Sequence, residues 1–248
     1  MSITGSSFPR LPICFCLDLT ESMAGKGVED AKNVLRSFQK ASVTALENGV
    51  CIETAILTFS NSTICVKKFE ESEASEDKIG FDYAGGRASG FRALHKCLDL
   101  IERRKKVYVD NGISFRRPWV ILISDGRFAP PEQGNRAKEA EYIKELIEAK
   151  SGKKCWFVPI QAGDCDIDRL AKCCFAKEAV TFENLDFETL VQTLSVSISQ
   201  SISRANEDQN PVEFLLKDIH KWGQIGQKGE KLCKCITNGI LVLAMFKA

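Results

Sequence analysis

The sequence predicts an α/β fold: a doubly wound, mostly parallel sheet with one antiparallel strand and helices on both faces. Two apolar runs, Ile13–Leu17 and Trp119–Ile123, lack polar alternation, which is typical of strands buried on both faces of a parallel sheet. Strand-like and helix-like segments alternate along most of the chain, and a single early hairpin interrupts them. This alternation is typical of doubly wound folds, in which right-handed crossovers place helices on both faces.

The first half of the chain supplies a strand, a helix and a hairpin. After the first apolar run we expect a helix over about 28–48, because apolar residues recur there at helical spacing and Gly49 follows as a helix-ending signal. The mostly apolar segment 51–59 predicts the second strand. The turn at 60–62 is short enough to force the next strand, 63–69, to pair with it in antiparallel fashion.

The second half repeats the alternation of strands and helices. A glycine-rich segment leads at residue 90 to a helix whose apolar residues fall on one face. After the strand that precedes Asp125, we expect a helix over 135–150, a strand over 153–160, a helix over 166–174, a strand over 179–182 and a helix over 186–203. The prediction is therefore one domain over residues 10–203, followed by a linker and apolar extension of unassigned role over 204–248.

Composition excludes several classes of protein. The net charge of +1 argues against a nucleic-acid binder. No run reaches the roughly eighteen apolar residues of a transmembrane helix, and the N-terminus lacks the apolar stretch of a secretory signal. The eleven cysteines are an odd number, and several lie in apolar strands, which favours reduced thiols over a disulfide framework. We expect a cytoplasmic protein with no nucleic-acid or membrane partner.

Polar oxygens follow two of the buried strands at their carboxyl ends. Asp18, Thr20 and Ser22 come directly after the first strand, and Asp125 ends the later one. Because open α/β sheets place ligand sites at this edge, we expect these side chains in one crevice. Two carboxylates with neutral hydroxyls suit a magnesium-like cation. Taken alone, the D-x-[ST]-x-S pattern is a weak signal that favours an Asx or Ser turn at the start of a helix over a metal site.

The order of the motifs resembles a known family. D-L-T-E-S-M at 18–23, a glycine-rich helix start at 85–90 and V-I-L-I-S-D-G at 120–126 resemble a von Willebrand factor A (vWA) domain with its metal-ion-dependent adhesion site, or MIDAS. Stretches within 160–203 resemble the bacterial TerY-like branch, which is associated with tellurite resistance and chemical stress. The resemblance covers about residues 10–204, and the tail lies outside it.

The resemblance implies a bound divalent cation, Mg²⁺ or Mn²⁺, that some residues contact directly and others through water. The predicted ligands are Asp18, Thr20, Ser22, Ser89 and Asp125. The family usually has Thr directly after Gly-Gly, where this chain has Arg87, so Ser89 is the candidate for the missing hydroxyl. Alternatively, the Arg87 guanidinium lies near the carboxylates and opposes the cation, leaving a metal-free site.

Other chemistry-bearing residues carry weaker signals. Cys173–Cys174 and Cys233-Lys-Cys235 lack the usual zinc spacing, so we interpret these cysteines as buried or incidental. His95 falls on a predicted helix and is interpreted as a surface or packing residue. The basic run 103–106 is interpreted as a solvated helix end in preference to a phosphate contact.

These observations favour a non-enzymatic protein-interaction module. An incompletely neutralised ion with an open position accepts an acidic group from a protein partner. The TerY-like resemblance implies partners of the phosphatase and kinase type in stress signalling. The alternative is a metal-free, degenerate vWA scaffold that binds partners through its helices or through the apolar tail at 236–246. An enzyme with thiol-redox or hydrolase chemistry is the third hypothesis.

Overall fold

The computed structural model places most of the predicted domain. It describes residues 9–47, 51–69, 81, 85–86, 89–127, 136–174, 236–237 and 240–241, with only the backbone described at 37, 40–47 and 136. The predicted strand at 179–182 and helix at 186–203 lie outside the described residues, as does most of the tail. The domain boundaries 10–203 and 204–248 therefore stay predictions.

Five strands form one sheet in which four run parallel. Its order is β3-β2-β1-β4-β5, with β1 at the centre, and only the pair of β2 and β3 is antiparallel. The α/β prediction of a mostly parallel sheet with one antiparallel strand is confirmed. The strands are β1 (Arg10–Asp18), β2 (Cys51–Phe59), β3 (Thr63–Lys67), β4 (Trp119–Ser124) and β5 (Trp156–Gln161).

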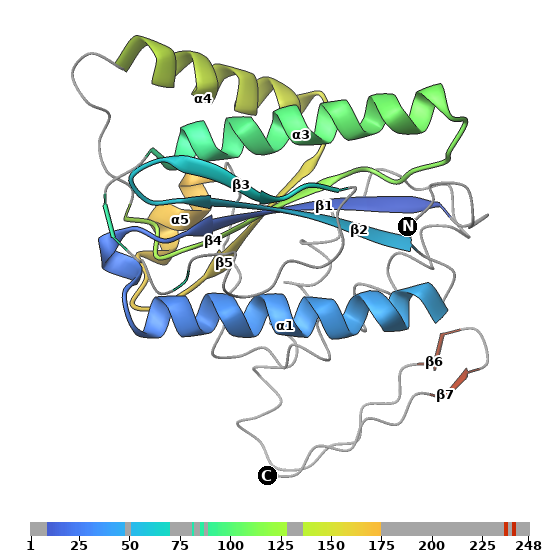
Figure 1. Ribbon diagram of the computed structural model, residues 1–248, viewed down its shortest axis with the longest axis horizontal. Coiled ribbons are helices and arrows are strands. Elements are labelled where there is room, and N and C mark those ends of the chain that lie inside the picture. The colour runs from blue at the N-terminus through green and yellow to red at the C-terminus, as the bar shows by residue number, and fades with distance from the viewer. Residues whose placement is uncertain are drawn as a thin grey trace.

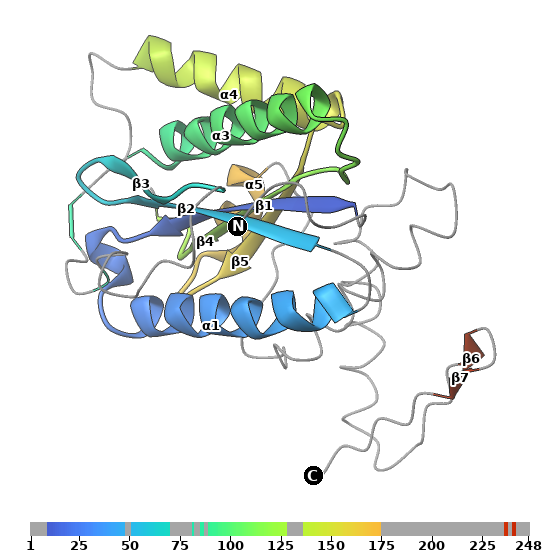
Figure 2. The same cartoon turned by 45° about the vertical axis from the view of Figure 1, so that its right-hand side comes forward.

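Helices cover both faces of the sheet, as Figures 1 and 2 show. The long helix α1 lies on one face, and α3 and α4 lie on the other, where buried residues of α5 join the same apolar core. A short 3-10 turn, η1, connects β1 to α1. The bounds are η1 (Glu21–Met23), α1 (Lys26–Glu47), α3 (Gly90–Asp110), α4 (Arg136–Ser151) and α5 (Ile167–Cys173).

The continuous apolar run of β1 is explained by the two cores that it separates. Because side chains alternate along a strand, Phe15 and Leu17 point to the α1 face. The Phe15 ring packs edge-on against that of Phe38, with the ring centroids 5.0 Å apart. Cys14 and Cys16 point to the opposite face and pack in the core beneath α3. With helices on both faces, β1 carries no charged or hydroxyl side chain between Arg10, its first residue, and Asp18, its last.

The tail contributes two very short strands. Residues Ile236–Thr237 (β6) and Ile240–Leu241 (β7) pair with each other in antiparallel fashion as a separate two-stranded sheet. These strands fall within the apolar tail segment, whose role stays unassigned. Within the described residues, no helix is long and apolar enough to cross a membrane.

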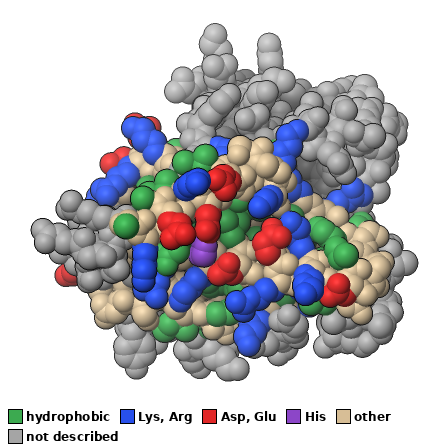
Figure 3. Space-filling view, turned by 90° about the horizontal axis from the view of Figure 1, so that it is seen from above, with side chains coloured by type: hydrophobic (Ala, Val, Ile, Leu, Met, Phe, Trp, Pro, Cys, Tyr) green, Lys and Arg blue, Asp and Glu red, His purple; other side chains and the backbone are tan. Residues whose placement is uncertain are grey.

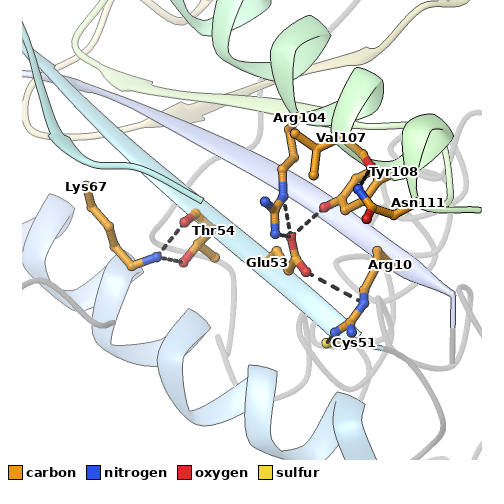
Figure 4. Close-up of polar contacts among 9 residues, drawn as sticks. All are labelled: Arg10, Cys51, Glu53, Thr54, Lys67, Arg104, Val107, Tyr108 and Asn111. Atoms are coloured by element: carbon orange, nitrogen blue, oxygen red, sulfur yellow. Dashed lines mark hydrogen bonds and ion pairs between the residues drawn. The ribbon is translucent and has the colours of Figure 1, made fainter. Parts of the chain in front are cut away.

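A buried polar cluster lies at the edge of the sheet where β1 and β2 begin (Figure 4). The Glu53 carboxylate accepts hydrogen bonds from Arg104 Nε at 2.8 Å and Nη2 at 2.6 Å, and from the Tyr108 hydroxyl at 2.5 Å. These three hydrogen bonds all go to Oε2 of Glu53, and Oε1 lies 3.6 Å from Arg10 Nε. The interpretation of the basic run 103–106 as a solvated helix end is wrong for Arg104, because α3 continues to Asp110 and buries this guanidinium.

Candidate functional site

The site begins where β1 ends, at Asp18. This carboxylate is fully buried, and each of its oxygens accepts hydrogen bonds from neutral groups. Oδ1 accepts from the backbone N–H of Thr20 at 2.9 Å and from its hydroxyl at 2.6 Å, while Oδ2 accepts from the Ser124 hydroxyl at 2.6 Å. The Thr20 hydroxyl lies 3.4 Å from that of Ser22, which is exposed. The Asx turn therefore forms, and two hydroxyls, those of Thr20 and Ser124, donate to this carboxylate.

The neighbouring strand β4 brings the second carboxylate to the same edge. Leu17 pairs with Ile123 in the parallel register, so Ser124 and Asp125 follow at the level of Asp18. Asp125 is 1% exposed, and its Oδ1 accepts the backbone N–H of Arg127 at 2.8 Å. Its Oδ2 is buried and has no hydrogen-bond partner among the described residues, although Arg127 Nε lies 3.9 Å away. One carboxylate oxygen at this edge thus has no hydrogen-bond donor among the described residues.

The glycine-rich segment is the third part of the site. Gly85 donates its N–H to the Leu19 carbonyl at 2.8 Å, and the Gly86 carbonyl accepts the N–H of Glu21 at 3.3 Å. Gly86 has a φ of +79°, and a Cβ atom there would lie 2.0 Å from Oδ1 of Asn61, so the close approach requires glycine. Gly85 and Gly86 therefore lie directly beside the end of β1, whereas Arg87 lies outside the described residues.

Ser89 makes different contacts from those expected of a ligand. Its hydroxyl oxygen accepts the backbone N–H of Arg92 at 3.3 Å and thereby caps α3. The same hydroxyl donates to Glu139 Oε1 in α4 at 2.6 Å. Two of its hydrogen-bonding positions are therefore used by α3 and α4. The structure brings Asp18, Thr20 and Asp125 together, while the hydrogen bonds of Ser89 connect α3 to α4.

The environment of Asp18 disfavours the ionised form of its carboxyl group. Burial raises the pKa of this carboxyl from 3.8 to about 6, and the charge of Asp125 adds to the rise, whereas hydrogen bonds from Ser124 and Thr20 lower it. Hydroxyl donors stabilise a carboxylate but bring no positive charge, so two negative charges share this edge without a full counter-charge.

The other sequence signals have structural roles. Burial raises the pKa of Cys14 and Cys16, and no cysteine in the described ranges forms a disulfide. His95 belongs to α3, and its ring centroid lies 4.6 Å from that of Tyr142 in α4. The ring also contacts Glu145. In Figure 3 the histidine, in purple, is seen beside acidic side chains. Cys233, Cys235 and His220 lie outside the described residues. Among the residues that the structure describes, no three His, Cys, Asp or Glu side chains group as metal ligands.

Sequence reasoning missed two residues of the site. Ser124 was assigned only to a strand, although it is the polar residue that ends an apolar run directly before Asp125. Its hydroxyl joins the two strands, because it donates to Asp18 and accepts the N–H of Gly126 at 3.0 Å. Arg127 gave a weaker signal, since a basic residue after an Asp-Gly pair resembles any polar loop residue.

Comparisons with known proteins give likenesses of fold alone. No protein-family model and no curated relative matches the chain. A structure of proximal thread matrix protein 1 from the mussel byssus is 13% identical with a TM-score of 0.43, covering 78% of this chain and 46% of its own. The manganese-loaded TRAP protein of Plasmodium vivax is 12% identical with a TM-score of 0.47, covering 76% of this chain and 72% of its own.

A third solved structure, a mutant of the PilB minor pilin from Streptococcus sanguinis, is 12% identical with a TM-score of 0.44; the match covers 84% of this chain and 64% of the pilin. This chain spans about half the length of the mussel protein. The strand order, the single antiparallel pair and the helices on both faces themselves show an α/β fold that is consistent with a vWA-like architecture.

The donor set fits a divalent cation of the magnesium type. Such ions prefer carboxylate and hydroxyl oxygens, and Asp125 Oδ2 is a buried carboxylate oxygen without a hydrogen-bond partner among the described residues. The hydroxyls of Thr20 and Ser22 lie within 3.4 Å of each other. The roles of Asp125, Thr20 and Ser22 as metal ligands stay predictions, because the structure gives only the positions of these side chains.

Proposed function

We propose that this protein is a non-enzymatic protein-interaction module that holds Mg²⁺ or Mn²⁺ at the carboxyl edge of its sheet. In this proposal Asp125 and the hydroxyls of Thr20 and Ser22 hold the ion, and Asp18 orients the hydroxyls and contacts the ion directly or through water. An acidic group of a protein partner completes the coordination. We further propose that the partners are phosphatase- or kinase-type proteins of cytoplasmic stress signalling, as the TerY-like resemblance implies.

The observation that carries the proposal is Asp125 Oδ2, which is buried and has no hydrogen-bond partner among the described residues. Leaving a buried carboxylate oxygen without a hydrogen bond costs about 1–3 kcal/mol, so a fold that keeps one needs a compensating partner. A divalent ion supplies that partner and neutralises the second carboxylate, Asp18, at the same edge. The remaining donors are neutral hydroxyls, so an ion held here keeps an attraction for a further anion.

One specific observation supports the metal-free scaffold as a second candidate. The hydroxyl of Ser89, which was expected to replace the missing threonine, is used by Arg92 N and Glu139. A site lacking this hydroxyl has fewer protein ligands, and a weakly held ion leaves partner binding to the helices or the tail. The two candidates differ in whether partner binding needs a metal.

Calorimetric titration of Mg²⁺ and Mn²⁺ into chelator-treated protein separates the two candidates. We expect saturable binding to the wild type and none to Asp18→Ala, while circular dichroism shows that both are folded. A peptide display library is then selected on the wild type with Mn²⁺. We expect the selected peptides to contain Asp or Glu and to elute with chelator. Absence of metal binding to the folded wild type would reject the metal-dependent function and leave the scaffold.

A further inference from the structure

An exposed guanidinium lies beside the carboxylate that faces the proposed ion. Arg127 Nε is 3.9 Å from Asp125 Oδ2, and the Arg127 side chain is 54% exposed while that of Asp125 is 1% exposed. The backbone N–H of Arg127 is bonded to the other oxygen of Asp125 at 2.8 Å, which holds the base of the side chain next to the site. Among the described residues, Arg127 is thus a positive charge that the structure places next to Asp125.

We propose that Arg127 is a built-in competitor of the metal: its guanidinium partly neutralises Asp125 in the metal-free protein and is displaced when a divalent ion binds. This inference rests on the proposed function, and it adds the residue that sets the affinity of the site. Arg127 lowers the affinity and thereby makes occupancy depend on the concentration of the ion.

The geometry allows the exchange. The distance of 3.9 Å is too long for a hydrogen bond, and an ion pair with one exposed partner is weak, so a divalent ion can replace it. More than half of the Arg127 side chain is in solvent, so it can rotate away without disturbing either core. A guanidinium that stays close to the ion would repel it, because like charges a few ångströms apart oppose each other even in water.

The test measures Mn²⁺ affinity by electron paramagnetic resonance of the free ion, in full-length protein at fixed ionic strength. Arg127→Gln removes the charge, Arg127→Lys keeps it, and Arg103→Gln removes an exposed charge toward the other end of α3. We expect Arg127→Gln to bind Mn²⁺ about three- to tenfold more tightly than the wild type. Arg127→Lys should stay within about twofold of the wild type, and so should Arg103→Gln.

The outcomes separate this inference from the proposed function. If the wild type binds Mn²⁺ and Arg127→Gln binds no more tightly, the competitor role is overturned while the metal site stands. An equal gain in Arg103→Gln would also overturn it, since net charge alone would then explain the change. If neither the wild type nor Arg127→Gln binds Mn²⁺ while both are folded, the metal site and the competitor role fail together.

Discussion

The carboxylates at the two ends of the parallel strands have different partners. Where β1 and β2 begin, Glu53 accepts hydrogen bonds from Arg104 and Tyr108 and pairs with Arg10 (Figure 4). Where β1 and β4 end, the groups that donate hydrogen bonds to Asp18 within the described residues are uncharged. Asp125 there keeps an oxygen without a hydrogen bond among the described residues.

From this difference we assign one edge to the stability of the fold and propose that the other serves binding. A buried carboxylate with two guanidiniums and a phenol is neutralised within the chain and links β2 to α3. A buried carboxylate surrounded by hydroxyls is oriented without being neutralised, so it retains an attraction for an external cation. The same fold thus contains a closed polar cluster at one edge and an incomplete one at the other.

Breaking the closed cluster should have the largest effect. Arg104→Met leaves the Glu53 carboxylate without its main donor, and breaking a buried ion pair from one side costs about 3–5 kcal/mol. We expect urea unfolding to show this loss. The matched control is Arg103→Met on the exposed side of the same helix, with a change within about 0.5 kcal/mol. Equal losses in the two variants would contradict the structural role of Glu53 and Arg104.

Neutralising the incomplete cluster should stabilise the metal-free protein. Because the folded pKa of Asp18, about 6, is above its ordinary value of 3.8, the folded state binds more protons between these values. Stability therefore falls as the pH rises from about 4 to about 6 and does not recover above that. Asp18→Asn removes this loss, and since Asn cannot accept from every donor, we expect a gain of about 1–2 kcal/mol at pH 7.5.

The measurement is urea unfolding in chelator across pH 4 to 8, with Asp18→Asn compared with the wild type at each pH. The difference between the two proteins should grow as the pH rises through the pKa of Asp18 and then become constant. A variant that is less stable than the wild type at pH 7.5 would contradict this expectation, because it would show that the hydrogen bonds to Asp18 outweigh the cost of burying its charge.

Removing one hydroxyl should have a smaller effect. Ser124→Ala deletes the donor to Asp18 Oδ2 and the acceptor of the Gly126 N–H, so we expect a loss of about 1 kcal/mol in the free energy of unfolding. It should also raise the pKa of Asp18 further, because that hydrogen bond lowers it. Carboxyl NMR titration of the variant measures the shift. A lowered pKa would contradict the arrangement of these hydrogen bonds.

Features that depend on residues close together in the sequence were predicted correctly, whereas side-chain contacts between distant segments were missed. Apolar runs and helical spacing specified β1, β4 and α1 closely, and the rule for parallel strands placed Asp18 beside Asp125. The partners of Glu53 were missed, although Arg104 continues the helical spacing of the buried Ile101 and precedes Tyr108 by four residues. Choosing a partner for such a residue needs the register of β2 against α3, which no local pattern contains.

The central claim is that the edge holding Asp125 is completed by a cation. A ligand that binds only the folded state stabilises it, by about 1.4 kcal/mol when its concentration is ten times the dissociation constant. Urea unfolding of chelator-treated protein with and without saturating Mn²⁺ measures this gain, with Asp125→Asn as the site variant and Arg103→Gln as the distant control. We predict a gain in the wild type and in Arg103→Gln that is absent from Asp125→Asn. An equal gain in Asp125→Asn, or none in the folded wild type, would contradict the account.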